Sequence, residues 1–113
     1  MQDCIFCKII RKEIPAEIIF ENDHVLVFKD IQPTAPVHLL LIPKKHIPTV
    51  LDLEDEDSAL MGEIHLVASQ VARELGLENG FRLVVNCNQD AGQVVFHIHF
   101  HLIAGRKLQW PPG

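Results

Sequence analysis

Three histidines alternate with apolar residues near the end of the sequence, in the segment from Val95 to Ile103. Strict alternation predicts a β-strand that is buried on one face. His97, His99 and His101 are therefore expected to share a single face of that strand. Four apolar residues would anchor the opposite face and hold the register: Phe96, Ile98, Phe100 and Leu102.

The spacing of these histidines limits what they can do together. A strand rises ~3.4 Å per residue, so neighbours on one face are about 7 Å apart and His97 is about 14 Å from His101. One metal ion cannot bind all three rings directly, but a pair such as His97 and His99 could share an ion. The outer two histidines could therefore serve different purposes.

A pair of cysteines near the start, Cys4 and Cys7, offers a second group of chemically competent side chains. Asp3 can cap a short helix, and on that helix the two thiols would point the same way. Only three residues precede the pair, so the redox Cys-x-x-Cys that follows a strand is disfavoured. Two interpretations stay open: buried cysteines acting as small hydrophobes, or half of a zinc site completed by histidines.

Composition narrows the class of protein. The chain has 113 residues, of which 48% are hydrophobic and 22% charged, which predicts one globular domain spanning residues 1–113. A net charge of -5 argues against nucleic acid as the main partner, which usually requires a basic face. No apolar run reaches bilayer length and no signal peptide is evident, so we expect a cytoplasmic protein without a membrane partner. Three cysteines do not form a disulfide framework at this size.

The remaining pattern predicts an antiparallel sheet and one long helix. Residues 17–21 and 24–29 read as a hairpin around Asn22-Asp23, and residues 37–43 and 81–86 read as further strands. Apolar residues recur at helical spacing from Leu60 to Leu75, and Gly76 follows as a C-terminal stop. We interpret the acidic run before this helix as a solvated helix start. The apolar stripe is wide enough for part of it to face a second copy of the chain.

Several single residues have both a plain and a functional interpretation. Asp30 could accept hydrogen bonds from sugar hydroxyls, although a turn-forming side chain is the simpler interpretation. His38 opens a buried strand and is more simply a satisfied core residue, and His46 could reach a metal or face solvent. Gly92 lets backbone N–H groups approach an anion, or it only makes a turn. Trp110, in a short proline-rich tail, is expected to pack on a partner subunit.

The segment Gln93-Val94-Val95-Phe96-His97-Ile98-His99-Phe100-His101-Leu102-Ile103 resembles the signature of the histidine-triad (HIT) superfamily. The likeness covers nearly the whole chain, including Ile42-Pro43-Lys44-Lys45-His46 and the ending Trp110-Pro111-Pro112-Gly113. These stretches are similar to the histidine-triad nucleotide-binding branch, whose members are homodimeric hydrolases of purine nucleoside phosphoramidates. The resemblance implies an α+β fold with a five-stranded antiparallel sheet and two helices, and a dimer with a continuous ten-stranded sheet.

The resemblance also implies roles for individual residues. His99 would be the nucleophile that attacks the α-phosphorus, while His101 and His38 would orient it and contact phosphate. The implied phosphate-binding and sugar-binding residues are Asn86, Gly92, Gln93, Val94 and Asp30. The implied base pocket is Ile9, Ile14, Phe28, Ile31 and Leu40, and Trp110 would reach the site of the other subunit. Cys4, Cys7, His46 and His97 would form a structural zinc site, and no catalytic metal is expected.

Two positions depart from the best-known members of the branch. Val94 stands where they carry a serine that assists the leaving group, and Cys7 provides a thiol that animal relatives lack. Two alternatives to a phosphoramidase therefore stay open: hydrolysis of dinucleoside polyphosphates, and a nucleotide-binding dimer with little turnover.

Overall fold

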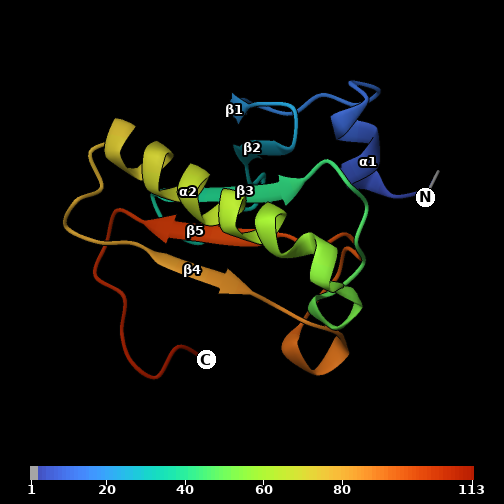
Figure 1. The fold of residues 1–113 in the computed structure, drawn as a ribbon. Helices are drawn as coiled ribbons and strands as arrows, with labels where there is room; N and C mark the ends of the chain where they lie inside the picture. Colours follow the sequence, from blue (N-terminus) through green and yellow to red (C-terminus); the bar gives the residue numbers. More distant parts are fainter. Residues whose placement is uncertain (1–2) are drawn as a thin grey trace.

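Five antiparallel strands form a single sheet in the computed structural model, which describes residues 3–113. The strands are β1 (Ile18–Glu21), β2 (Val25–Lys29), β3 (Val37–Pro43), β4 (Arg82–Val85) and β5 (Phe100–Ala104). Their order across the sheet is β1-β2-β3-β5-β4, and every neighbouring pair is antiparallel (Figure 1). This arrangement confirms the predicted α+β architecture, and the predicted third strand matches β3 residue for residue.

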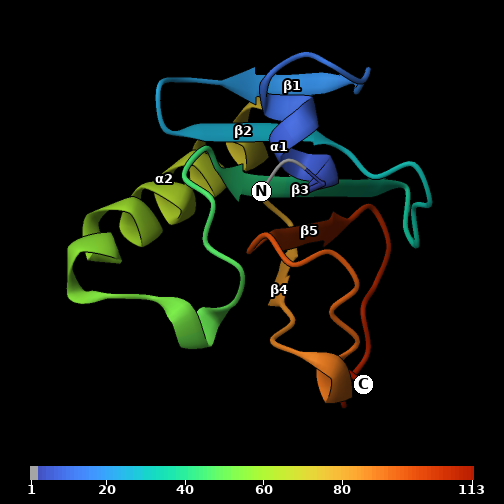
Figure 2. The ribbon, with the colours of Figure 1, turned by 90° about the vertical axis from the view of Figure 1, so that its right-hand side faces the viewer.

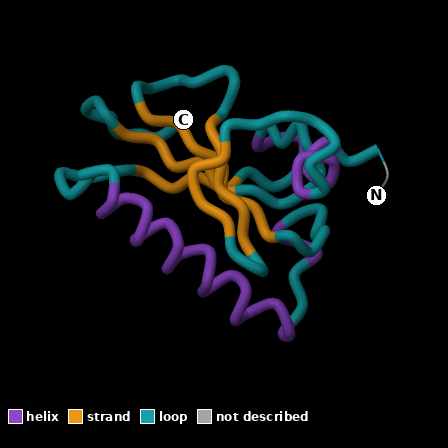
Figure 3. Tube along the Cα trace, turned by 90° about the horizontal axis from the view of Figure 1, so that it is seen from above, coloured by secondary structure: helices purple, strands orange, loops and turns teal. Residues whose placement is uncertain are grey.

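Two helices cover opposite faces of this sheet. The long helix α2 (Ser58–Glu74) lies along one face, as the view from above in Figure 3 shows, and the short helix α1 (Ile5–Ile10) packs on the other (Figure 2). Alternate residues of β2 and β3 contact the two helices in turn, so both strands are apolar almost throughout. Burial on both faces explains why their sequences do not alternate.

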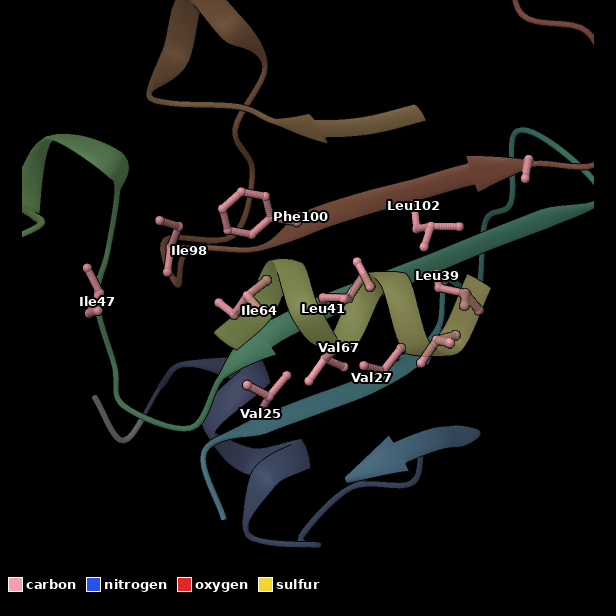
Figure 4. Close-up of a cluster of buried hydrophobic side chains, with 13 residues drawn as sticks. Val25, Val27, Leu39, Leu41, Ile47, Ile64, Val67, Ile98, Phe100 and Leu102 are labelled. Atoms are coloured by element: carbon pink, nitrogen blue, oxygen red, sulfur yellow. The ribbon is translucent and has the colours of Figure 1, made fainter. Parts of the chain in front are cut away.

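The larger core lies between α2 and the sheet (Figure 4). Four residues of α2 are buried there at helical spacing: Ile64, Val67, Ala68 and Val71. They meet Val25 and Val27 of β2 and Leu39 and Leu41 of β3. The helix ends as predicted, because Gly76 has a φ of 73° and Leu77 N–H donates back to the Ala72 carbonyl at 2.9 Å.

The acidic run before α2 is not simply a solvated helix start, so that prediction was wrong for one residue. The run forms two short 3-10 turns, η1 (Val50–Asp52) and η2 (Asp55–Asp57), and Asp57 is only 3% exposed. Its carboxylate accepts hydrogen bonds from Lys45 Nζ at 2.6 Å and from the Glu54 N–H at 2.9 Å. Asp57 thus fastens the start of α2 to the loop that follows β3.

The predicted histidine strand is shorter than the alternation suggested. Residues 95–99 are outside the sheet, and pairing begins at Phe100, which faces Leu41 of β3 and Val85 of β4. The physical reason lies at Pro43, which has no N–H to donate and whose carbonyl accepts from His97 Nε2 at 2.8 Å. Ile98 N–H donates instead to the Ile47 carbonyl in the loop after β3.

The alternation of burial nevertheless continues beyond the strand itself. Ile98, Phe100 and Leu102 belong to the core under α2, as predicted, while Phe96 is 47% exposed and anchors nothing there. The predicted strand at residues 81–86 is confirmed as β4, which is shorter by one residue at each end. Across residues 3–113, none of the helices combines the length and the apolar character that crossing a bilayer would demand.

We expect Asp57→Ala to lower the melting temperature of the protein near pH 7 by several degrees, because it leaves the Glu54 N–H and Lys45 Nζ without their partner. The hydrogen bond and charge of Lys45 hold the pKa of the Asp57 carboxyl below its usual range in the fold. The unfolded chain binds that proton more readily, so this stabilisation is full above about pH 5 and is lost on acidification below the ordinary aspartate pKa of about 4.

Thermal unfolding followed by circular dichroism between pH 7 and pH 3 measures both effects. Asp55→Ala is the matched control, because it removes an exposed carboxylate from the same turn. A loss of melting temperature that is equal in the two variants, or that stays constant down to pH 3, would contradict this account.

Candidate functional site

The three histidines divide between two neighbouring sites. His97 is completely buried and contacts the cysteine pair, whereas His99 and His101 line a cavity on the α1 side of the sheet. The His99 and His101 rings lie 5.1 Å apart between centroids, and the His97 ring lies 5.0 Å from that of His46. This division follows the expectation that the outer histidines serve different purposes.

The first site brings together Cys4, Cys7, His46 and His97, whose donor atoms all lie within 4.8 Å of one another. Cys7 Sγ is 3.3 Å from His46 Nδ1 and 3.6 Å from His97 Nδ1, and Cys4 Sγ is 3.4 Å from His97 Nδ1. A tetrahedral zinc ion with ordinary bond lengths separates a nitrogen ligand from a sulfur ligand by about 3.6 Å. The cluster therefore has the donor set and the spacing to hold a metal ion.

Local structure presents the ligand atoms of this cluster. Cys4 itself caps α1, because its Sγ accepts from the Cys7 N–H at 3.3 Å, so the expectation that Asp3 caps the helix was wrong. A thiol at the cap places Cys4 and Cys7 one turn apart on the same side. His97 Nε2 donates to the Pro43 carbonyl at 2.8 Å, which leaves a lone pair on Nδ1 facing both sulfurs.

Burial favours the uncharged forms of Cys7, His46 and His97 when no cation is bound. Burial lowers the pKa of His97 to about 4, lowers that of His46, and raises that of the Cys7 thiol, which the neighbouring Cys4 raises further. Neutral imidazoles are ready metal ligands, whereas the thiols must release their protons when a cation binds. The cluster is thus better suited to bind a cation than to hold charged side chains without one.

The second site is a cavity of about 590 Å³ lined by α1 and by residues of β2, β3 and β5. Its wall contains most of the residues implied by the family resemblance: Ile9, Ile14, Phe28, Asp30, Ile31, Leu40, Asn86, Gly92, Val94, His99 and His101. Apolar side chains from α1, β2 and β3 form much of the wall, which also includes the polar side chains of Asp30, Asn86, His99 and His101. Such a cavity suits a ligand with one flat apolar end and one polar end.

His99 carries a fixed tautomer. Its Nδ1 lies 2.8 Å from the His97 carbonyl oxygen, which can only accept, so Nδ1 holds the proton and Nε2 keeps a lone pair. Burial lowers the pKa of His99, so the ring is neutral near pH 7. Phe6 of α1 packs edge-on against the ring, with centroids 5.1 Å apart. His99 is thus a rigid, neutral imidazole whose free nitrogen is available as a nucleophile.

A hydrogen-bond chain fixes the tautomers of the other two rings. The Thr34 N–H donates to His38 Nδ1 at 3.0 Å, so the His38 proton must sit on Nε2. That Nε2–H lies 2.9 Å from His101 Nδ1 and 3.4 Å from Asp30 Oδ2, and it therefore donates toward His101. His101 must then carry its own proton on Nε2. Burial, followed by repulsion from His99 and His38, lowers the pKa of His101 to about 4.

The donor atoms of Asp30, His38 and His101 also lie within 4.8 Å of one another. A cation between them would have to take the place of the proton that His38 donates to His101. His38 Nδ1 accepts from an amide and cannot take that proton instead, so a bound cation would turn His38 into an anion. The geometry therefore favours a shared proton at this cluster.

Three predicted site residues do not line the cavity. His38 is 7% exposed and sits behind His101, as the simple core interpretation held, and it touches His101 instead of the cavity. The Gln93 side chain is buried and bonded to main-chain groups, and it does not line the cavity. Trp110 is 82% exposed and does not line the cavity of its own chain.

Asp30 forms a turn, as its simpler interpretation held. Its Oδ1 accepts from the Gln32 N–H at 2.8 Å in a turn, and its other oxygen approaches His38. Sequence reasoning missed Phe6, although helical spacing could have found it: Phe6 lies three residues before Ile9, and therefore on the same side of α1.

Comparison with known proteins agrees with this geometry. Residues 11–108 match the HIT domain family. An uncharacterized HIT-like protein of Synechocystis sp. is 53% identical over 112 residues, which cover 99% of this chain and 98% of that protein. Among solved structures, a HIT family hydrolase from Legionella pneumophila superposes with a TM-score of 0.96 at 53% identity, covering 98% of this chain and 100% of the other.

A more distant structure carries a functional name. A histidine triad nucleotide-binding protein from Candida albicans has a TM-score of 0.83 and 34% identity, covering 96% of this chain and 83% of that one. The family match spans most of the chain, and the relatives are similar over nearly their full length. This chain therefore belongs to the HIT domain family.

Proposed function

We propose that this protein is a hydrolase that cleaves the phosphorus–nitrogen bond of purine nucleoside 5'-phosphoramidates through a covalent nucleotidyl intermediate on His99. The observation that carries the proposal is the tautomer of His99, which leaves a lone pair on Nε2. His99 lines a cavity that has both apolar and polar side chains on its wall. Neighbouring structures titled HIT family hydrolase and histidine triad nucleotide-binding protein support the reaction type and the ligand class.

The reaction would proceed in two displacements. His99 Nε2 attacks the α-phosphorus, the P–N bond breaks, and the departing amine takes a proton from water because Val94 has no hydroxyl to supply one. The positive charge that develops on the imidazole is stabilised by its Nδ1–H bond to the His97 carbonyl. Water then attacks phosphorus and gives up a proton to the hydroxide that the first step leaves, the bond between His99 Nε2 and phosphorus breaks, and the nucleoside monophosphate leaves with His99 again neutral.

Neighbouring groups would hold the substrate. Neutral His101 would offer its Nε2–H to a phosphate oxygen, and the backbone N–H of Val94 would offer a further donor. Asp30 Oδ2 would accept from ribose hydroxyls at the polar end of the cavity. The base would lie among Ile9, Phe28 and Leu40, where a purine buries the most apolar surface.

We further propose that Cys4, Cys7, His46 and His97 hold a structural zinc ion. Four protein ligands close the coordination shell, so the ion would supply folding energy and rigidity instead of catalysis. His97 would link the two sites, because its ring would bind zinc while its carbonyl accepts from His99.

A homodimer is the third part of the proposal. Among residues 3–113, strand β4 ends the sheet and pairs on one side only, with β5, and Val85 on it is 38% exposed. Pairing of two β4 edges would make the continuous ten-stranded sheet, and it would give the exposed Trp110 a partner site to cover.

Substitution of the nucleophile tests the reaction. We expect His99→Ala to reduce hydrolysis of adenosine 5'-phosphoramidate by at least about 10³-fold, since the covalent route is lost. The rate is measured by chromatography of the released nucleotide. The control variant His24→Ala should hydrolyse the substrate at the wild-type rate, because His24 lies on the exposed hairpin turn. Faster turnover of a dinucleoside polyphosphate would favour the alternative hydrolase, and equal rates for wild type and His99→Ala would leave only nucleotide binding.

A hydroxyl at position 94 should speed up departure of the poorest leaving groups. We expect Val94→Ser to raise kcat on an alkylamine phosphoramidate by about ten-fold, because the hydroxyl can pass a proton to the amine. An arylamine substrate, whose leaving group is less basic, should gain much less. Val94→Ala controls for the loss of bulk, and an equal gain in Val94→Ala would contradict the proton-transfer explanation.

Metal analysis tests the zinc proposal. We expect purified wild-type protein to contain stoichiometric zinc and Cys7→Ser to lose most of it, with a lower melting temperature. Cys87→Ser is the matched control, because Cys87 lies outside the cluster. The Cys87→Ser protein should keep its zinc. A well-folded, metal-free wild-type protein whose melting temperature does not rise on adding zinc would exclude the site.

A further inference from the structure

The buried side chain of Gln93 forms three hydrogen bonds to the main chain. It is 6% exposed, its Oε1 accepts from the Asn88 N–H at 2.8 Å, and its Nε2 donates to the carbonyls of Pro48 at 2.8 Å and Val95 at 3.0 Å. The partners fix the orientation of the amide, because an N–H can only donate and two carbonyls can only accept. Each end of the amide group therefore has the partner that its chemistry requires.

These bonds close a loop that the backbone alone would not favour. Asn88 has φ 69° and ψ -174°, a region that residues other than glycine rarely adopt, and Gly92 has φ 86°. Between them lies the short turn η3 (Gln89–Ala91). The Gln93 N–H donates to the Asn88 carbonyl at 3.1 Å while the Gln93 side chain accepts from the Asn88 N–H, so one residue binds both polar groups of the strained position.

The same side chain fastens this loop to another part of the fold. Pro48 belongs to the connection between β3 and η1, two residues after His46. Val95 lies on the other side of Gln93, on the way to the histidines. A single amide thus joins the loop before Gly92, the segment leading to His99 and the connection after β3.

The segments that Gln93 joins carry much of the polar wall of the cavity. Asn86, Gly92, Val94 and Val95 all line it, whereas Gln93 does not. Gln93 therefore sets the position of the loop backbone relative to His99, although its own side chain does not line the cavity.

We propose that Gln93 is a positioning residue, which holds the loop of residues 86–95 at the distance from His99 that nucleotide binding and attack require. This inference rests on the proposed function for the identity of the ligand. It predicts that Gln93 acts on phosphate binding and turnover through the loop, without contact with the nucleotide.

Two substitutions at Gln93 and one control test the proposal. Gln93→Glu keeps the shape and the acceptor for Asn88 but turns an oxygen toward the carbonyls of Pro48 and Val95, whereas Gln93→Ala removes all three bonds. Gln89→Glu makes the same charge change on an exposed residue of the same loop. We expect both Gln93 variants to weaken binding of adenosine 5'-monophosphate by about ten-fold or more and to lower kcat, with Gln93→Glu at least as impaired as Gln93→Ala. Gln89→Glu should stay within two-fold of wild type.

Hydrogen exchange separates positioning from general loss of stability. The backbone amides of residues 88–95 should exchange faster in both Gln93 variants, while amides of β2 and β3 stay protected. Ile64→Val, in the core under α2, gives a destabilised reference that should keep its affinity for the nucleotide. The proposal would be overturned if both Gln93 variants bound adenosine 5'-monophosphate as tightly as Gln89→Glu does and if their amides at residues 88–95 exchanged at the same rates as in Gln89→Glu.

The two proposals fail in different ways. If wild-type protein binds no adenosine 5'-monophosphate and hydrolyses no phosphoramidate, the proposed function fails. The exchange rates of residues 88–95 then still decide whether Gln93 holds the loop. If the wild type binds and turns over substrate while the Gln93 variants do the same, only the role of Gln93 is lost.

Discussion

The candidate site depends on hydrogen bonds between histidine rings and main-chain groups whose direction cannot be reversed. A carbonyl accepts from His99 Nδ1, another accepts from His97 Nε2, and an amide donates to His38 Nδ1. Each bond decides which nitrogen of the ring keeps its lone pair. The backbone therefore assigns His97 Nδ1 to the sulfurs and leaves His99 Nε2 free as a nucleophile, before any ligand is present.

The end of the sheet makes these assignments possible. If residues 95–99 had continued β5, their carbonyls and amides would have paired with a neighbouring strand. Because pairing stops at Phe100, the carbonyls of Pro43 and His97 are free to accept from imidazoles, and Ile98 is held by the Ile47 carbonyl. Because the strand ends early, these carbonyls orient histidine side chains instead of pairing with another strand.

Sequence periodicity predicted much of this fold, because buried residues recur at regular intervals along strands and helices. The alternation at Ile98, Phe100 and Leu102 and the helical spacing in α2 both follow from packing on one apolar core, and both are confirmed. Where a strand stops is decided by a partner distant in sequence, here Pro43, so the length of the histidine strand was predicted wrongly. The same limit applies to Asp57 and Gln93. Their side chains look solvated or ligand-binding in sequence, and only the loops that fold over them supply the partners that bury them.

The cavity uses neutral donors where a phosphate site often uses cations. Lys29 is on its wall but pairs with Glu17 at 2.9 Å, and burial favours the neutral forms of His99 and His101 by lowering the pKa of each ring. A fixed positive charge beside His99 would hold a phosphate more tightly before and after reaction alike, which favours binding without favouring the chemical step. In the proposed reaction, a neutral ring would become positive only when its Nε2 bonds to phosphorus, at the moment when the His97 carbonyl can stabilise that charge. If the proposed reaction holds, burial of the histidines, which costs the fold the solvation of these polar rings, would be the feature that lets the site distinguish a reacting phosphorus from a merely bound one.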